Sequence, residues 1–381
     1  MSKRKKILFV CTQDWFFQSH FLPLAQAVAK EDGYQGTLLT TLVTAHKKLA
    51  SNGLELVPLD FKRSSMNPLS ALVVLWRLVV ALRRQRPDIV HFIALKPVLL
   101  GGLAALFVPG TGIVYHVTGL GFLAEGKSRF VAFARWVCFS LLGLYLKRKR
   151  SWLVCENPDD LDFLAKYGAP VTTRASIFGG AGVNPEQYPQ MPPGAQNPPR
   201  AAYVGRMIWT KGLDVLVEAM EKLAARGIAL NLDMYGAPDA GNPKAVPVAT
   251  LEQWSKKPGV KWHGPTRDIL KVWRQSEIAI ISTRTREGMP RAMLEAASCG
   301  RALIVTDIAG CRHFVRDGVE GLVVPPEDSD ALARALEKLA LDKALRKRMG
   351  HAARQRVLNG YTERHVQEAA LKIYATLLKT L

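Results

Sequence analysis

One carboxylate precedes a predicted helix start near residue 290 and another follows it. Glu287 comes directly before Gly-Met-Pro, and Pro290 suits the first position of a helix, where no backbone amide hydrogen is needed. The amides at a helix start lie at its positive dipole end and favour a phosphate or a polar sugar. Glu295 follows about a turn and a half into that helix. One carboxylate can therefore accept hydrogen bonds from sugar hydroxyls and the other from ribose hydroxyls.

Two cations follow the first predicted strand of the second half of the chain. That strand, 201–205, ends in glycine and is followed by Arg206, so the guanidinium is placed at the carboxyl edge of a sheet. Doubly wound folds bind their ligands at this edge. Lys211 comes directly before a predicted helix over 213–225 and can reach the same place. Two such cations can hold a diphosphate between them, which favours one binding site over unrelated surface charges.

Two sheets are needed to position these side chains. Short β-rich apolar runs alternate with longer helical runs along the chain, which is typical of βαβ units with a parallel sheet. The expected strands cover residues 7–11, 36–43, 54–59, 88–93, 112–118 and 152–156 in the first half, and 201–205, 229–235, 277–282, 301–306 and 321–324 in the second. The sequence therefore predicts the α/β class with two Rossmann-like domains.

A proline-rich stretch divides the two halves. The chain has 381 residues, a length that favours two domains. Residues 185–199 contain six prolines, too many for a helix or a central strand, and are interpreted as an interdomain linker. We expect an N-terminal domain over 1–184 and a C-terminal domain over 200–361. Residues 362–381 form a predicted last helix that can pack back on either domain.

The overall charge and the cysteines restrict the class of partner. Lysine and arginine exceed the acids by 20 charges, so the protein must attract something anionic: nucleic acid, a membrane or a phosphorylated small molecule. A nucleic-acid binder is supported by charge alone, because no binding motif is recognisable. The five cysteines form no CxxC pair, which argues against disulfides and a zinc site. The longest uncharged apolar runs, 97–108 and 136–146, are too short to span a bilayer.

One segment of the first domain, 126–155, is both basic and aromatic and contains no acid. Its basic residues are Lys127, Arg129, Arg135, Lys147, Arg148, Lys149 and Arg150. Such a segment can lie on an anionic membrane surface. It can equally be a helix that packs on the core and has a solvated charged end, so both interpretations stay open.

The second half resembles the donor domain of the retaining GT-B glycosyltransferases of family four. The likeness rests on Gly205-Arg206, Lys211-Gly212, the pair Glu287 and Glu295, Cys299-Gly-Arg301 and residues 319–325. It implies the GT-B fold, in which two Rossmann-like domains face each other across a cleft. It also implies a nucleotide-sugar donor site made of Gly205, Arg206, Lys211, Glu287, Gly288, Met289, Pro290 and Glu295.

The first half resembles a narrower branch of that family, through residues 14–17, 118–122, 157–160 and 180–183. That branch adds sugars, often N-acetylhexosamines, to polyprenyl-diphosphate-linked glycans at the cytoplasmic face of the membrane. The resemblance implies that this domain, on the acceptor and membrane side, carries the acceptor or cleft candidates Asp14, Trp15, His20 and Lys96.

Two departures from the family pattern concern the reaction itself. Many relatives place a histidine near the donor sugar, where this chain has Thr118. His116, two residues earlier in the same predicted strand, points to the same face and is a candidate to replace it. The catalytic candidates are therefore Glu287, Thr118 and His116. The glycine-rich loop that is common after the first strand is also absent.

Two other chemistries compete with sugar transfer. Residues 119–124 fit the G-x-G-x-x-A fingerprint of a dehydrogenase, but the acid expected about twenty residues later is missing between Glu125 and Glu156. Residues 160–162 and 328–330 fit the D-x-D pattern of metal-dependent sugar transfer, yet an aspartate also suits a helix start. The two cations and the helix start can neutralise a leaving diphosphate, so no metal is expected.

The sequence and its resemblance together predict transfer of a sugar, an N-acetylhexosamine, from a UDP-sugar to a polyprenyl-diphosphate-linked saccharide with retained configuration. No metal, no other cofactor and no nucleic-acid partner is expected. The expected location is the cytoplasm, peripherally on the anionic inner face of the cell membrane. A soluble or lipopolysaccharide-type acceptor is the alternative within the same fold.

Overall fold

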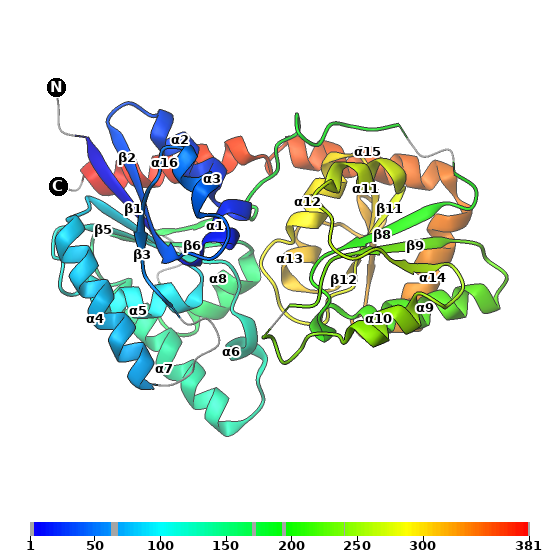
Figure 1. The fold of residues 1–381 in the computed structure, drawn as a ribbon, viewed down its shortest axis with the longest axis horizontal. Helices are drawn as coiled ribbons and strands as arrows, with labels where there is room; N and C mark the ends of the chain where they lie inside the picture. The colour runs from blue at the N-terminus through cyan, green and yellow to red at the C-terminus, as the bar shows by residue number, and fades with distance from the viewer. Residues whose placement is uncertain (1–3, 62–67, 170–172, 193–195, 240, 380–381) are drawn as a thin grey trace. The chain divides into compact units, whose positions relative to one another are not determined.

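The computed structural model describes residues 4–61, 68–169, 173–192, 196–239 and 241–379. They form two compact units, Met1–Ala181 with Glu363–Leu381, and Gly182–Thr362. Each unit contains one parallel sheet with helices on both faces (Figure 1). The predicted α/β class with two Rossmann-like domains is thereby confirmed.

The first unit is built on a seven-stranded parallel sheet in the order β3-β2-β1-β4-β5-β6-β7. Its strands are β1 (Lys5–Gln13), β2 (Tyr34–Thr41), β3 (Glu55–Pro58), β4 (Ile89–Ile93), β5 (Gly112–Val117), β6 (Ser151–Cys155) and β7 (Ala175–Ile177). β4 and β5 are buried along their whole length, which suits central parallel strands that are apolar apart from one histidine each. The strand order reverses between β1 and β4, and such a switch point is where doubly wound sheets bind ligands.

Helices cover both faces of this sheet. They are α1 (Asp14–His20), α2 (Leu22–Lys30), α3 (His46–Ser51), α4 (Pro68–Gln85), α5 (Leu95–Ala105), α6 (Gly121–Glu125), α7 (Arg129–Tyr145), α8 (Pro158–Ala165) and α16 (Glu363–Lys379). α4, α5 and α7 share one apolar core with the sheet, and α1, α2, α3 and α16 share the other. The last helix therefore packs on the first unit, where the Tyr374 hydroxyl lies 2.6 Å from Nδ1 of His91 in β4.

The second unit repeats this design with six parallel strands in the order β10-β9-β8-β11-β12-β13. Its strands are β8 (Arg200–Val204), β9 (Asn231–Tyr235), β10 (Val260–Trp262), β11 (Ile278–Ile281), β12 (Ala302–Thr306) and β13 (Gly321–Val324). Its helices are the 3₁₀ turn η1 (Trp209–Lys211), α9 (Leu213–Ala225), α10 (Val248–Trp254), α11 (Ile269–Gln275), α12 (Arg291–Ser298), α13 (Ala309–Arg312), α14 (Ser329–Leu341) and α15 (Lys343–Leu358). Here the strand order reverses between β8 and β11.

The proline-rich segment is part of the second unit and not a linker. Tyr188 and Met191 are buried in the core that also contains α12, and Arg354 of α15 donates to the Tyr188 carbonyl at 2.8 Å. Prolines exclude helix and central strand, but they allow an extended segment to pack against a domain. The chain instead passes between the units beside residues 181 and 362. Residues 193–195 of the expected linker lie outside the described residues.

Candidate functional site

The switch point of the second unit brings three of the predicted donor residues to one sheet edge. β8 and β11 are parallel neighbours, with Ala201 opposite Ile278. The segments that follow these strands therefore leave the sheet side by side, at its carboxyl edge. The first carries Arg206 and Lys211, and the second carries Glu287.

Lys211 and Glu287 form an ion pair at this edge. Nζ of Lys211 lies 2.5 Å from Oε1 and 2.7 Å from Oε2 of Glu287, and the Thr283 hydroxyl donates to Oε1 at 2.8 Å. Burial raises the pKa of the Glu287 carboxyl, but Lys211, Thr283 and the more distant Arg206 outweigh burial and hold that pKa below its usual value. The carboxylate is therefore charged at neutral pH and can accept hydrogen bonds.

Backbone contacts hold the two segments together. The Ser282 hydroxyl donates to the Lys211 carbonyl at 2.8 Å, and the Arg284 amide donates to the Thr210 carbonyl at 3.0 Å. Gly212 has a φ of +66°, and a Cβ at this position would lie 2.2 Å from the Ser282 carbonyl oxygen. A side chain there would force the segments apart, so glycine after the lysine is required by the close approach.

Arg206 lies at the outer rim of this edge. Its guanidinium is exposed and forms an ion pair of 2.7 Å with Asp239, which follows β9. The buried Tyr203 hydroxyl donates to the Arg206 carbonyl at 3.1 Å and would clash with a Cβ on Gly205. An exposed ion pair contributes about 0–1 kcal/mol, so a diphosphate can compete with Asp239 for the guanidinium.

The helix start after Glu287 lies one residue later than predicted. Pro290 is the N-cap of α12 and Arg291 is its first residue, and the Pro290 carbonyl accepts from the Met293 amide at 3.1 Å. The turn formed by Gly288 and Met289 is buried. No side chain caps this end of α12 through a hydrogen bond.

Gly310 of α13 fixes the position of that turn. A Cβ on Gly310 would lie 1.4 Å from the Gly288 carbonyl oxygen, so the two backbones would have to separate. We expect Gly310→Ala to weaken UDP binding at least tenfold and to cost about 1–3 kcal/mol of stability through overpacking. Calorimetric titration with UDP measures the first effect. Gly360→Ala is the matched control, because its Cβ meets nothing within 4 Å; equal UDP affinity in Gly310→Ala and wild type would separate the turn from the donor site.

Glu295 has less surface open to a ligand than the sequence suggests. It lies on α12, its side chain is 8% exposed, and Arg291 one turn earlier donates to Oε1 at 2.8 Å. Burial raises the pKa of its carboxyl above the usual value, because Arg291 and a hydrogen bond from Tyr188 lower that pKa by less than burial raises it. Tyr188 comes from the proline-rich segment, so sequence reasoning that treated this segment as a linker missed this partner.

His116 is a core residue and not an open ligand group. Its side chain is fully buried, and Nδ1 lies 3.1 Å from Nε2 of His91. Burial lowers the pKa of His116 to about 3, so the ring is neutral. Thr118, directly after β5, is partly exposed at the carboxyl edge. The structure therefore leaves Thr118, and not His116, open at this edge of the first unit.

Asp14 is a structural residue of the first unit. Its buried carboxylate accepts hydrogen bonds from the backbone amides of Val43, Thr44 and Ala45 at 2.8–3.0 Å to Oδ2, and from Trp15 at 2.7 Å to Oδ1. It ties the segment after β2 to the start of α1. The expectation that Asp14 faces an acceptor is therefore replaced by a role in holding this loop.

The other acceptor candidates stay partly exposed. Trp15 and His20 lie on α1, which follows β1, and Lys96 lies at the start of α5, which follows the neighbouring strand β4. Trp15 and Lys96 are thus brought to the switch point of the first sheet. Burial lowers the pKa of Lys96, against the opposing effect of Asp60.

Three of the seven basic residues predicted to contact a membrane donate hydrogen bonds to backbone carbonyls of the first unit. Arg135 donates to the Ala124 carbonyl at 2.9 Å, Arg148 to the Thr111 carbonyl at 2.8 Å, and Arg150 to the Leu377 carbonyl at 3.0 Å. The remaining four are exposed: Lys127, Arg129, Lys147 and Lys149. The three hydrogen-bonded arginines therefore fit the interpretation of a segment packed on the core, and the four exposed residues stay open to a membrane contact.

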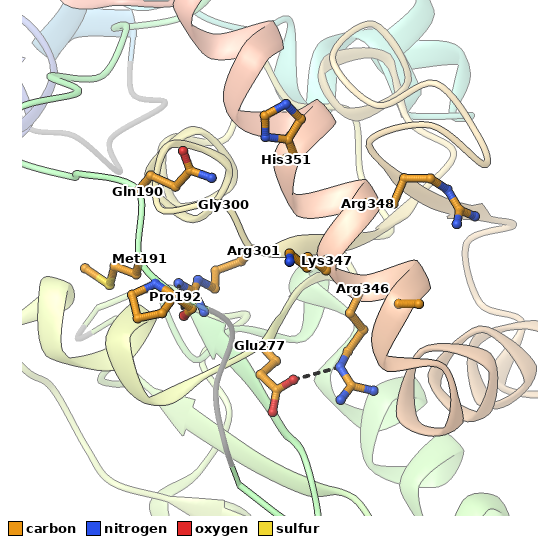
Figure 2. Close-up of a pocket in the computed structure, with 11 residues that line it drawn as sticks. Gln190, Met191, Pro192, Glu277, Gly300, Arg301, Arg346, Lys347, Arg348 and His351 are labelled. Atoms are coloured by element: carbon orange, nitrogen blue, oxygen red, sulfur yellow. Dashed lines mark hydrogen bonds and ion pairs between the residues drawn. The ribbon is translucent and has the colours of Figure 1, made fainter.

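A separate cavity of about 630 Å³ lies at the opposite, amino edge of the second sheet (Figure 2). Glu277 and Arg301, which precede β11 and β12, line it with Arg346 of α15. Glu277 pairs with Arg346 at 2.8 Å, and Arg301 donates to the Ser276 carbonyl at 3.1 Å. These charges are paired within the second unit, and the cavity lies at the other end of the strands from the predicted donor residues.

Neither a cluster of metal-ligating side chains nor a membrane-spanning helix is present among the described residues. No group of three or more histidine, cysteine, aspartate or glutamate side chains there is placed to hold a metal ion. No described helix is long and apolar enough to cross a bilayer. In the second D-x-D sequence, Asp328 caps α14 by accepting from the Ala331 amide at 2.8 Å.

Two family models match the chain. The model described as "Glycosyl transferase 4-like" matches residues 6–151, and the model described as "Glycosyl transferases group 1" matches residues 186–356. Each match lies within one of the two compact units.

Individual proteins are similar over nearly the whole chain. The N,N'-diacetylbacillosaminyl-diphospho-undecaprenol alpha-1,3-N-acetylgalactosaminyltransferase of Campylobacter jejuni is 23% identical over 88% of this chain and 89% of its own. The structure of a glycosyltransferase from Rickettsia africae has a TM-score of 0.77 and 20% identity, covering 99% of this chain and 100% of that one. The structure of Anabaena HepE in complex with UDP-glucose has a TM-score of 0.77 and 16% identity, again covering 99% and 100%.

Proposed function

This chain belongs to the GT-B glycosyltransferases, and we propose that it transfers a sugar from a UDP-sugar to a polyprenyl-diphosphate-linked saccharide. The sugar is proposed to be an N-acetylhexosamine, transferred with retained configuration. The observation that carries the donor half of this proposal is the Lys211–Glu287 pair at the switch point of the second sheet. A cation and a charged carboxylate in contact there suit a diphosphate next to a sugar with free hydroxyls.

The chemistry of transfer assigns different tasks to these side chains. When the bond between the anomeric carbon and the diphosphate breaks, negative charge accumulates on the leaving UDP. Lys211 and Arg206 are placed to stabilise that charge, the kind of preorganised electrostatic effect that contributes most to many enzymatic rates. Glu287 keeps Lys211 in place and accepts hydrogen bonds from the sugar hydroxyls. Because these cations belong to the protein, we propose that no metal ion is required.

The acceptor half of the proposal is supported by the Campylobacter jejuni relative. Its name describes transfer of N-acetylgalactosamine to a saccharide on undecaprenyl diphosphate. That relative is aligned over nearly the whole chain, including the first unit, where Trp15, Lys96 and Thr118 lie at the carboxyl edge. Because this acceptor is lipid-linked, we propose that the enzyme acts peripherally on the inner face of the cell membrane.

A transfer assay tests both halves. The protein is incubated with UDP-N-acetylglucosamine, UDP-N-acetylgalactosamine or UDP-glucose and a short-chain polyprenyl-diphosphate disaccharide in detergent, with and without EDTA. We expect one UDP-N-acetylhexosamine to extend the acceptor by a single sugar, detected by mass spectrometry, at equal rates in both conditions. Transfer only to a lipid-free saccharide would overturn the proposed lipid-linked acceptor. Loss of activity with EDTA would overturn the proposed metal independence.

A further inference from the structure

The outward face of α4 is apolar where a surface helix is normally polar. Val74, Leu78 and Leu82 point inward and belong to the core of the first unit. Leu69, Leu72 and Trp76 repeat with the same helical spacing on the exposed side, and Trp76 is 66% exposed. This helix is thus apolar on both sides in its first half.

The same pattern recurs on α7. Val131, Phe139 and Leu142 are buried. Phe130, Phe133 and Trp136 are exposed, Phe130 to 71%, and the rings of Phe133 and Trp136 lie 6.2 Å apart. Exposed tryptophan and phenylalanine side chains in a row are uncommon on a monomer and mark an interaction surface.

Both rows lie in one layer and toward one edge of the sheet. α4 and α7 pack on either side of α5, on the same sheet face (Figure 1). Helices that follow parallel strands begin at the carboxyl edge, so the first halves of α4 and α7 both lie toward it. That edge also carries Thr118 and Lys96.

The charges around these rows identify the partner. Neither α4 nor α7 contains an acid, and residues 68–150 contain twelve lysines and arginines against two acids. Lys127, Arg129 and Arg84 are exposed near the apolar rows. A second copy of the chain would place like charges against each other in a symmetric contact, whereas an anionic bilayer attracts these cations and accepts the aromatic rings.

We propose that the α4–α7 face, defined by Leu69, Leu72 and Trp76 of α4 and Phe130, Phe133 and Trp136 of α7, docks on an anionic lipid bilayer. The sequence pointed to the basic and aromatic segment 126–155, which contains α7. The apolar face of α4 is what the structure adds. The inference rests on the proposed function for its purpose, since docking brings the carboxyl edge to a lipid-linked acceptor. The docking itself is measured without any sugar.

Vesicle flotation tests the face directly. We expect wild type to float with phosphatidylglycerol-containing vesicles and not with pure phosphatidylcholine vesicles. Trp76→Ser/Phe133→Ser, which removes one exposed ring from each helix, should lower the partition coefficient at least tenfold. Val248→Ser/Leu341→Ser is the matched control in the second unit, where both side chains are exposed, and should float like wild type.

A charge variant keeps the test independent of folding. Lys127→Gln/Arg129→Gln alters only exposed cations, and about fivefold loss per residue predicts a twenty- to thirtyfold weaker partition. Lys256→Gln/Lys343→Gln, also exposed, is its control. Equal flotation of wild type and both α4–α7 variants, or none by wild type, would overturn the proposal.

Two further outcomes separate this inference from the proposed function. Suppose that wild type self-associates, that both α4–α7 variants are monomeric, and that wild type does not bind vesicles. This result would assign the face to a second copy of the chain and overturn the membrane proposal. Normal transfer to the acceptor in detergent by variants that no longer float would support docking as a separate property. Flotation without transfer to any lipid-linked acceptor would leave the docking surface in place and overturn the acceptor.

Discussion

Lys211→Ala is expected to lower kcat/KM for sugar transfer by about three orders of magnitude. A charge-assisted hydrogen bond to the diphosphate contributes about 1.5–3 kcal/mol, which is about ten- to a hundredfold in donor affinity. Groups that stabilise charge developing in the transition state contribute a further ~10²-fold or more in kcat. The substitution also removes the cation that contacts Glu287 at 2.5 Å. Steady-state kinetics with calorimetric titration of UDP measure the two losses separately.

The same variant changes the pH dependence in a defined direction. In wild type the pKa of Glu287 is held below its usual value, so the ionised carboxylate stabilises the folded protein above the ordinary carboxyl range. That stabilisation is lost as the pH falls through the lowered pKa. Without Lys211, burial dominates and raises the pKa of Glu287, so the acid limb of the activity profile moves to higher pH.

Lys256→Ala is the control for this variant, because Lys256 is exposed just after α10 and lies outside the predicted site. It should match wild type in kinetics, in UDP affinity and in the acid limb. If Lys211→Ala bound UDP as tightly as this control and kept its acid limb, the donor site would have to lie elsewhere in the second unit.

The placement of the proposed donor residues at one sheet edge could be predicted from the sequence because it depends on local signals. Arg206 lies just after a strand, Lys211 lies just before a helix, and Glu287 stands before a proline at a helix start. Each of the eleven expected strands is present, and the parallel topology brings the ends of β8 and β11 together. The edge strands β7 and β10 escaped prediction because each has three residues and no buried apolar run.

Features that depend on the direction and burial of a side chain could not be predicted. His116 and Thr118 share a strand face in the sequence pattern, yet one is enclosed by core aromatics and the other is partly exposed beyond the strand end. Asp239 and Tyr188 contact Arg206 and Glu295 from segments far away in the chain. No spacing rule links such residues, since their proximity arises from packing.

Asp14→Ala is expected to destabilise the first unit by about 3–4 kcal/mol. The buried carboxylate accepts four backbone amide hydrogen bonds, and leaving buried donors unsatisfied costs about 1–3 kcal/mol each. Val43 and Thr44 are exposed and can bond to water after the change, which keeps the total below the full sum. Thermal unfolding should move down by about 10 °C for a unit of this size.

Asp14→Asn and Asp32→Ala decide between a structural role for Asp14 and an acceptor contact. The asparagine side chain keeps the shape, but its amide group offers one acceptor oxygen in place of two. The unfolding temperature of Asp14→Asn should therefore lie between those of wild type and Asp14→Ala. Asp32 is exposed after α2, and its loss should leave unfolding unchanged. A residue that contacts the acceptor would instead raise KM for the acceptor while unfolding stays at the wild-type temperature. Since Asp14 contacts backbone amides through both carboxylate oxygens, we expect the asparagine variant to lower the unfolding temperature and leave that KM within about twofold of wild type.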